Sequence, residues 1–235
     1  MIIIRLLHSL FFYLVTAVTF IIGTTITLCF VPFVRPKHKP FQIAAQLWSR
    51  MLVFFSLVRV KVSGLENVPK DTPLIIAANH QGAADILLVL AFLPVRFRFA
   101  IKKELFKIPV FGWYLKRAGY FSIDREVVLS AYRTVEKIIE IIKQGECVLI
   151  FPEGTRSRTG ELGRFKRGSL LAALKSGAPI LPVAISGSFN ILKKGSWLFH
   201  PCPVKLSIGR PIEIKSEADY DGKVAEVRET IARML

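Results

Sequence analysis

Hydrophobic positions divide the chain into two regions with different patterns. Residues 6–34 contain no Asp, Glu, Lys or Arg, a stretch longer than the roughly 20 residues that a helix needs to cross a bilayer. A second apolar stretch, residues 41–58, carries polar side chains near its start, which favours an amphipathic helix lying in the membrane interface. We therefore predict a pair of membrane-anchoring helices in residues 1–59. The alternative is a helix pair buried in a soluble core.

From about residue 60 onward, short strand-like runs alternate with longer helix-like ones. Residues 95–99 alternate strictly between apolar and basic positions, as expected of a half-exposed strand. Apolar residues recur at helical spacing between 126 and 144, Gly145 ends that pattern, and a terminal helix is predicted from Asp221. The strand-like runs are residues 74–78, 95–101, 120–123, 147–151, 180–185 and 204–208.

This alternation predicts the class of fold. Strands that alternate with helices form an α/β layer structure with a mostly parallel sheet flanked by helices, and we assign it to residues 60–235. Ligands of such sheets bind where strands end and helices begin. The residues that directly follow the strand-like runs are therefore the candidates for chemistry.

A histidine and an aspartate follow the first buried run, within Asn79–Asp85. Five helical steps rotate a side chain by roughly 140°, so His80 and Asp85 cannot share one helix face. They can meet if His80 stays at the strand end and Asp85 opens the next helix, since residues 82–84 are small. A carboxylate on one imidazole nitrogen leaves the other free as a base. The alternative is a loop histidine followed by an N-cap aspartate.

A second motif, residues 151–158, follows another buried run and reads FPEGTRSR. Gly154 permits a tight turn, and Arg156 and Arg158 place guanidinium groups on the loop. A guanidinium binds phosphate through a bidentate fork that lysine cannot reproduce. The motif therefore predicts a phosphate pocket, with a solvated basic loop as the alternative.

Composition favours a membrane partner. The 33 Lys+Arg against 17 Asp+Glu give a formal net charge of +16, which attracts nucleic acid, anionic lipid or acidic carriers and cofactors. The hydrophobic content of 52% and the long apolar segment favour membrane lipids and argue against nucleic acid. Arg35, Lys37 and Lys39 directly follow that segment. They predict a cytoplasmic (inner) membrane location, with the catalytic domain facing the cytoplasm.

The three cysteines are far apart and form no CxxC pair. Their number and spacing predict neither a disulfide framework nor a zinc site. Cys147 lies within a strand-like run, where a cysteine usually acts as a small hydrophobic residue.

Taken together, the motifs resemble those of the glycerolipid acyltransferase family, specifically the bacterial 1-acylglycerol-3-phosphate acyltransferases. The family's NHxxxxD is present as Asn79–Asp85, and its FPEGTRS is complete in residues 151–157. Gly119–Arg125 matches the second family motif apart from an extra Ser122. Residues 180–184 match the fourth motif, and residues 102–105 match a Lys-x-Glu-Leu element.

The resemblance implies a membrane-bound enzyme of phospholipid synthesis. It would transfer a fatty acyl group from acyl-CoA or acyl carrier protein to the free hydroxyl of lysophosphatidate, giving phosphatidic acid, with no cofactor and no metal. His80 would deprotonate the hydroxyl and Asp85 would orient His80. The residues implied in substrate binding are Lys102, Arg125, Glu153, Gly154, Thr155 and Arg156, with a salt bridge as the alternative role of Arg125.

Two other functions remain open from the sequence. A member of the same family could use glycerol 3-phosphate or a lyso-aminolipid as acceptor. A non-catalytic basic protein could tether to membranes, although the complete motifs argue against it.

Overall fold

The computed structural model describes residues 2–123, 128–166, 168–192 and 196–235. The strands are β1 (Val60–Ser63), β2 (Ile75–Ala78), β3 (Phe97–Lys102), β4 (Phe121–Ile123), β5 (Cys147–Ile150), β6 (Ile180–Ser186) and β7 (Val204–Ile208). The α-helices are α1 (Ile2–Phe30), α2 (Lys39–Phe55), α3 (Asp85–Phe92), α4 (Phe111–Arg117), α5 (Val128–Lys143), α6 (Leu171–Ser176) and α7 (Tyr220–Met234).

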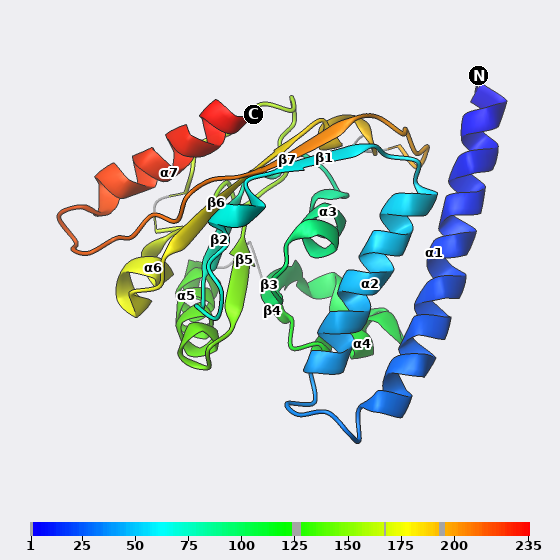
Figure 1. Cartoon of the computed structure of the whole chain (residues 1–235), viewed down its shortest axis with the longest axis horizontal. Helices are drawn as coiled ribbons and strands as arrows, with labels where there is room; N and C mark the ends of the chain where they lie inside the picture. The colour runs from blue at the N-terminus through cyan, green and yellow to red at the C-terminus, as the bar shows by residue number, and fades with distance from the viewer. Residues whose placement is uncertain (1, 124–127, 167, 193–195) are drawn as a thin grey trace.

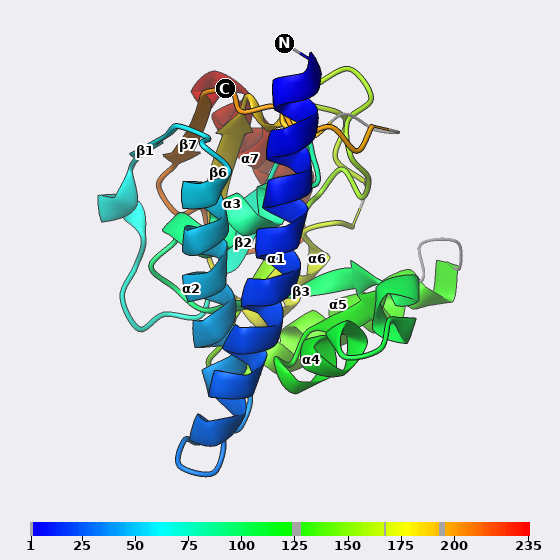
Figure 2. The same ribbon diagram turned by 90° about the vertical axis from the view of Figure 1, so that its right-hand side faces the viewer.

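The strands in the described part of the chain form one sheet with the order β1-β7-β6-β2-β5-β3-β4. Every neighbouring pair is parallel except β6 and β7. Helices lie on both faces of this sheet (Figures 1 and 2). The predicted mostly parallel α/β fold is therefore confirmed, and β1, which the apolar pattern did not single out, is added as an edge strand.

The central strand β2 shows how the two faces are filled. Ile76 and Ala78 pack in the core shared with α2 and α3, whereas Ile75 and Ala77 pack in the core shared with α5, α6 and α7. All four side chains are fully buried. A strand covered on both faces reads as a continuous apolar run, which is why this strand was visible in the sequence.

The N-terminal helices pack against the sheet domain along one side (Figures 1 and 2). Phe41 and Leu52 of α2 are each 1% exposed and belong to the core on the α3 side of the sheet. Gln46 donates to the Val95 carbonyl at 3.0 Å, and Arg50 donates to the Ala91 carbonyl at 2.8 Å. One side of α2 is thus part of the domain's own core.

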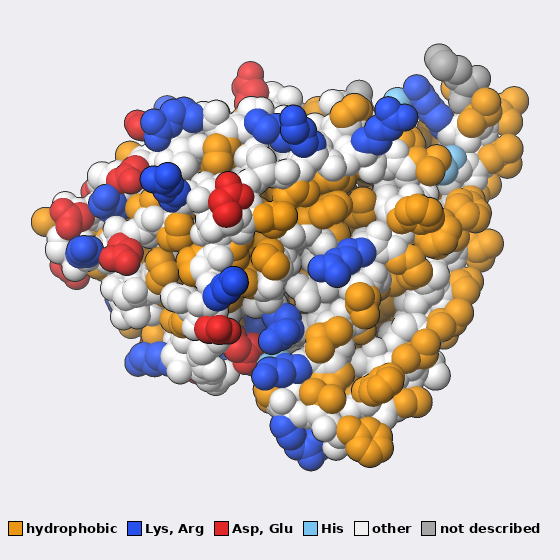
Figure 3. Space-filling model, in the orientation of Figure 1, with side chains coloured by type: hydrophobic (Ala, Val, Ile, Leu, Met, Phe, Trp, Pro, Cys, Tyr) orange, Lys and Arg blue, Asp and Glu red, His pale blue; other side chains and the backbone are white. Residues whose placement is uncertain are grey.

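Helix α1 exposes most of its apolar side chains. Ile3, Leu14 and Ile21 are 71%, 64% and 60% exposed, and hydrophobic side chains line the edge of the molecule that α1 forms (Figure 3). Among the described helices, α1 alone is long and apolar enough to cross a membrane.

The prediction of a half-exposed strand at residues 95–99 is wrong at Arg98, which is 9% exposed. Its Nε donates to Glu146 Oε2 at 2.8 Å, and its second nitrogen pairs with the other carboxylate oxygen. A guanidinium can be buried when a carboxylate satisfies it in this bidentate way. Gly119, at φ +77°, leaves room for it, because a Cβ there would lie 3.1 Å from Arg98 Nε.

A side chain extends β2 beyond its last residue. Asn79 is 1% exposed; its Oδ1 accepts from the Ile185 N–H at 2.7 Å and its Nδ2 donates to the Ile185 carbonyl at 2.9 Å. The amide thus replaces one unit of the β2–β6 ladder and fixes where the chain turns toward His80.

Replacing Asn79 by Ala should destabilise the protein, because it leaves two buried backbone groups of Ile185 without partners. Each unsatisfied group costs about 1–3 kcal/mol, so we expect a loss of about 2–6 kcal/mol. For a chain of this size that loss corresponds to a fall in Tm of at least about 4 °C. Thermal melts in detergent measure it. Asn190→Ala, at an exposed asparagine, is the control, and equal melting of both variants would contradict the assigned role of Asn79.

Candidate active site

His80 and Asp85 adopt the arrangement that the sequence predicted. His80 lies just after β2, and Asp85 is the first residue of α3. His80 Nδ1 is 2.7 Å from Asp85 Oδ2. The same oxygen accepts the backbone N–H groups of Gln81 at 2.7 Å and Gly82 at 2.8 Å. The turn itself therefore fixes the carboxylate that orients the imidazole.

Gly82 is required for close packing. A Cβ at this position would lie 2.8 Å from the backbone oxygen of Ser188. Any larger residue would push the turn away from the segment that follows β6. The small residues between His80 and Asp85 thus allow the turn to pack closely on its neighbour.

The His80 ring is fixed in a way that leaves one nitrogen available. The ring stacks on Phe151 with centroids 3.9 Å apart and 17° between the planes. Among the described residues, none forms a hydrogen bond with Nε2. Asp85 is fully buried, and its Oδ1 has no hydrogen-bond partner in the part of the chain that the structure describes. With its proton on Nδ1, the imidazole presents a basic Nε2, and the Asp85 charge would stabilise the imidazolium.

Glu153 joins the two motifs. Its Oε1 accepts the His80 backbone N–H at 2.8 Å, and its Oε2 accepts the Gly163 N–H at 2.8 Å. The Ser157 N–H donates to the His80 carbonyl at 2.7 Å. A Cβ on Gly163 would lie 2.7 Å from Glu153 Oε2, so this contact also needs a glycine. Because both of its oxygens bind backbone amides, Glu153 positions the site.

The loop after β5 surrounds a basic pocket of about 490 Å³. Arg156, Arg158 and Arg164 line it and are exposed. Within the described part of the chain, no carboxylate forms an ion pair with any of the three. Thr155 lines the same pocket. Glu153 and Glu161 also line the pocket, but the three guanidinium groups outnumber them. Guanidinium groups around one hollow suit a phosphate group.

The remaining predicted substrate-binding residues occupy different positions. Gly154 has φ +71°, and a Cβ there would lie 2.6 Å from the Lys166 side chain, which packs over it. The Lys102 side chain is 68% exposed at the end of β3, with its Nζ 3.6 Å from Glu104; it does not line the pocket. Arg125 lies outside the described residues.

Sequence reasoning missed Arg164 and Lys166. They lie seven and nine residues after the end of the FPEGTRS motif. They return to it because Gly163 binds Glu153 and the Lys166 N–H donates to the Pro152 carbonyl at 2.9 Å. The only local signal was the cluster of basic residues around Phe165.

Two other chemistries receive no support from the described residues. Burial raises the pKa of the Cys147 thiol in β5, which is the opposite of what a cysteine nucleophile needs. The described residues contain no cluster of three or more His, Cys, Asp or Glu side chains that could hold a metal ion.

Comparison with known proteins matches this chain to characterised relatives. It is 32% identical over 213 residues to 1-acyl-sn-glycerol-3-phosphate acyltransferase of Pseudomonas aeruginosa, covering 88% of this chain and 81% of the relative. It is 36% identical over 162 residues to the Bacillus subtilis protein of the same name, covering 68% and 76%. A chloroplastic relative from Arabidopsis thaliana is 33% identical over 222 residues, covering 91% of this chain. The alignment spans only 61% of that plant protein.

A solved structure is similar over nearly the whole chain. The crystal structure of the 1-acyl-sn-glycerophosphate acyltransferase PlsC from Thermotoga maritima superposes with a TM-score of 0.85 at 33% identity, covering 98% of this chain and 96% of that one. The acyltransferase family model matches residues 59–186, from the residue before β1 to the end of β6 and including both motifs. The chain therefore belongs to the acyltransferase family.

Proposed function

We propose that this protein transfers a fatty acyl group from an acyl thioester to the free hydroxyl of 1-acylglycerol 3-phosphate, forming phosphatidic acid. The observation that carries the proposal is the His80 imidazole, held through Nδ1 by Asp85 at 2.7 Å, while no described residue forms a hydrogen bond with Nε2. The names of the bacterial and plant relatives support this choice of acceptor.

The reaction needs one group that acts first as a general base and then as a general acid. Nε2 of His80 takes the proton from the acceptor hydroxyl while that oxygen attacks the thioester carbonyl carbon. The tetrahedral intermediate then collapses, the C–S bond breaks, and the leaving thiolate receives the proton from Nε2. Asp85 stabilises the imidazolium between the two transfers. No covalent acyl-enzyme is required.

The phosphate of the acceptor would bind in the basic pocket of the loop after β5. Arg156, Arg158 and Arg164 supply guanidinium groups there. Because Ser157 and Glu153 fasten this loop to His80, a phosphate bound in the pocket is held at a defined position relative to the base. Lys102 and Arg125 remain proposed as additional phosphate contacts.

The acyl donor would be acyl-CoA or acyl carrier protein, both of which are anionic and complement the net charge of +16. Purified full-length protein incubated with lysophosphatidate and each donor should form phosphatidic acid. Glycerol 3-phosphate and a lyso-aminolipid, supplied in parallel, test the alternative acceptors. No product with any acceptor would support a non-catalytic tether instead.

We also propose that α1 anchors the protein in one leaflet of the cytoplasmic membrane, with the site facing the cytoplasm. The helix is about 43 Å long at 1.5 Å per residue, yet its inner side contacts the domain along much of that length. Ser9 accepts the Phe199 N–H at 2.8 Å, Thr19 accepts from Trp48 at 3.0 Å, and Phe20 packs on Tyr114. A full span would place those parts of the domain inside the bilayer, whereas a helix along the surface would not.

Removing the base should abolish most of the turnover. His80→Ala should lower kcat by about 10²–10⁴-fold, the usual contribution of general-base catalysis. Asp85→Asn should be similarly impaired, because the tautomer is no longer fixed. Steady-state assays with lysophosphatidate measure both, and circular dichroism checks the fold. A folded His80→Ala protein that keeps more than roughly a tenth of wild-type turnover would show that another group is the base.

Removing Arg156 should mainly weaken acceptor binding. A charge-assisted hydrogen bond contributes about 1.5–3 kcal/mol, so Arg156→Ala should lose about 10- to 150-fold in kcat/KM, chiefly through the KM for lysophosphatidate. Arg156→Lys should recover only part of this, because a point charge cannot make the bidentate contact. Arg210→Ala, at an exposed arginine outside both motifs, is the control. A higher KM for the acyl donor alone would show that Arg156 binds the thioester donor and not the acceptor phosphate.

Apolar anchoring should resist salt. Full-length protein should stay on vesicles at 1 M NaCl, where the Debye length is about 3 Å. Leu14→Asp combined with Ile21→Asp, at positions 64% and 60% exposed, should lower the salt-resistant fraction because two charges would enter the apolar face. Leu65→Asp, outside α1, is the control. Complete release of the wild-type protein by salt would argue against insertion of α1.

A further inference from the structure

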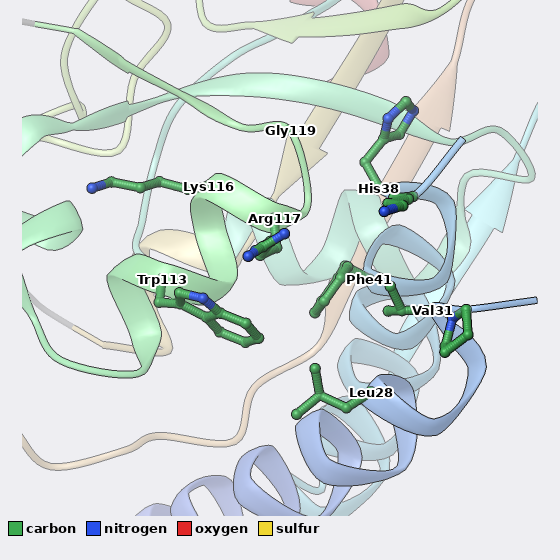
Figure 4. A pocket seen from close by; sticks show the side chains of 10 residues that line it. Leu28, Val31, His38, Phe41, Trp113, Lys116, Arg117 and Gly119 are labelled. Carbon is green, nitrogen blue, oxygen red and sulfur yellow. The ribbon is translucent and has the colours of Figure 1, made fainter. Parts of the chain in front are cut away.

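A second basic pocket lies at the far end of α1. It has a volume of about 480 Å³, within the range of about 300–1,000 Å³ typical of small-molecule sites. It forms where the end of α1, the α1–α2 connection and α4 meet (Figure 4). Leu28, Val31 and Trp113 give it an apolar wall, and Lys37 and Arg117 add positive charge.

The charges in this pocket are not neutralised. Within the described part of the chain, no carboxylate forms an ion pair with Lys37, Lys116 or Arg117, and no acidic residue lines the pocket. The Arg117 guanidinium lies 5.5 Å from the centroid of the Trp113 ring, and Figure 4 shows it pointing between that ring and Phe41. Stacking on an aromatic face leaves the N–H groups at the guanidinium edge available for an anion.

This pocket is separate from the candidate active site. Its lining contains no residue of Asn79–Asp85 or of residues 151–158, although it includes Gly119, the first residue of the second family motif. Phe12 of α1 and Ala84 of the catalytic turn line one small cavity. Val31, which lines the basic pocket, follows the last residue of α1 and is therefore about 28 Å from Phe12 along the helix axis, at 1.5 Å per residue. His38, also in the lining, bonds Glu146 just before β5 begins. The pocket thus lies toward the amino-terminal edge of the strands, opposite to His80.

The exposed side chains around the pocket indicate which kind of anion it binds. Phe30 and Phe33 next to it are 57% and 84% exposed, and Trp113 is 38% exposed. Tryptophan and exposed apolar side chains beside cations are typical of the membrane–water interface. An anion bound here would have its charged part among the cations and any attached apolar chains against the end of α1.

We propose that this pocket binds the phosphate-bearing head group of an anionic membrane phospholipid. Arg117 makes the bidentate phosphate contact, and Lys37 adds a second charge. The acyl chains lie along the exposed apolar end of α1. Such a lipid would fix the end of α1 farthest from the catalytic turn.

The test measures binding of short-chain phosphatidylglycerol to full-length protein in neutral detergent, by calorimetry and without thioester. Phosphatidylcholine with the same chains and inorganic phosphate are the comparison probes. We expect saturable binding of phosphatidylglycerol, and binding at least about 10-fold weaker for the other two. A tenfold change corresponds to about 1.4 kcal/mol, close to the contribution of one charge-assisted hydrogen bond.

The variants separate this pocket from the active site. Arg117→Gln should weaken phosphatidylglycerol binding about 10-fold or more, whereas Arg156→Gln and Arg210→Gln should change it less than about 2-fold. Lys37→Gln, in the exposed connection, is a second variant, expected to weaken binding several-fold. Melting without lipid checks that each variant is folded.

Three results would overturn the proposal. Unchanged binding in folded Arg117→Gln and Lys37→Gln proteins would exclude the pocket. Equal weakening by all four substitutions would indicate a general effect of net charge. Equal affinity for inorganic phosphate would indicate a site for free anions. Equal affinity for phosphatidylcholine would indicate an apolar groove that does not select the head group.

Discussion

The carboxylate of Glu153 accepts one backbone N–H from each of two loops that are far apart in the chain, those of His80 and Gly163. Both contacts are short and the side chain is buried. Charge-assisted bonds in such a setting are strong, and each amide would otherwise be a buried donor without a partner. The loop after β5 is therefore held at the end of β2. Together with the Ser157 N–H, which donates to the His80 carbonyl, this carboxylate joins the base to the basic pocket.

Local interactions were visible in the sequence. The strands β2, β5 and β6 are buried on both faces, so each forms an apolar run with a clear end. The contact between His80 and Asp85 could be predicted because the two residues are five positions apart and residues 82–84 of the turn are small. The preference of parallel sheets for ligands at their strand ends then placed the site.

Interactions between distant segments were not visible. Arg98 looked like the outward side chain of a half-exposed strand, because nothing near it in the chain shows that Glu146 neutralises it. Glu153 does line the basic pocket, as the motif predicted, but its contacts with the His80 and Gly163 amides could not be predicted, since other segments contribute them. Lys166 and Arg164 return to the motif only through the fold of the intervening loop. The positive charge could be counted from the sequence, but its concentration in two pockets depends on which cations find a carboxylate.

The fixed ring of His80 has a consequence for the order of events. Nδ1 is bound to Asp85 and the ring face is stacked on Phe151, so the imidazole cannot turn over to carry a proton from one side to the other. If His80 is the base, the proton must arrive and depart at the same nitrogen. The attacking hydroxyl and the departing sulfur then have to occupy the same small region together. Because the acyl group also passes directly to the hydroxyl, with no covalent acyl-enzyme, both substrates must be bound before any bond changes, and the enzyme would follow a sequential, ternary-complex kinetic scheme.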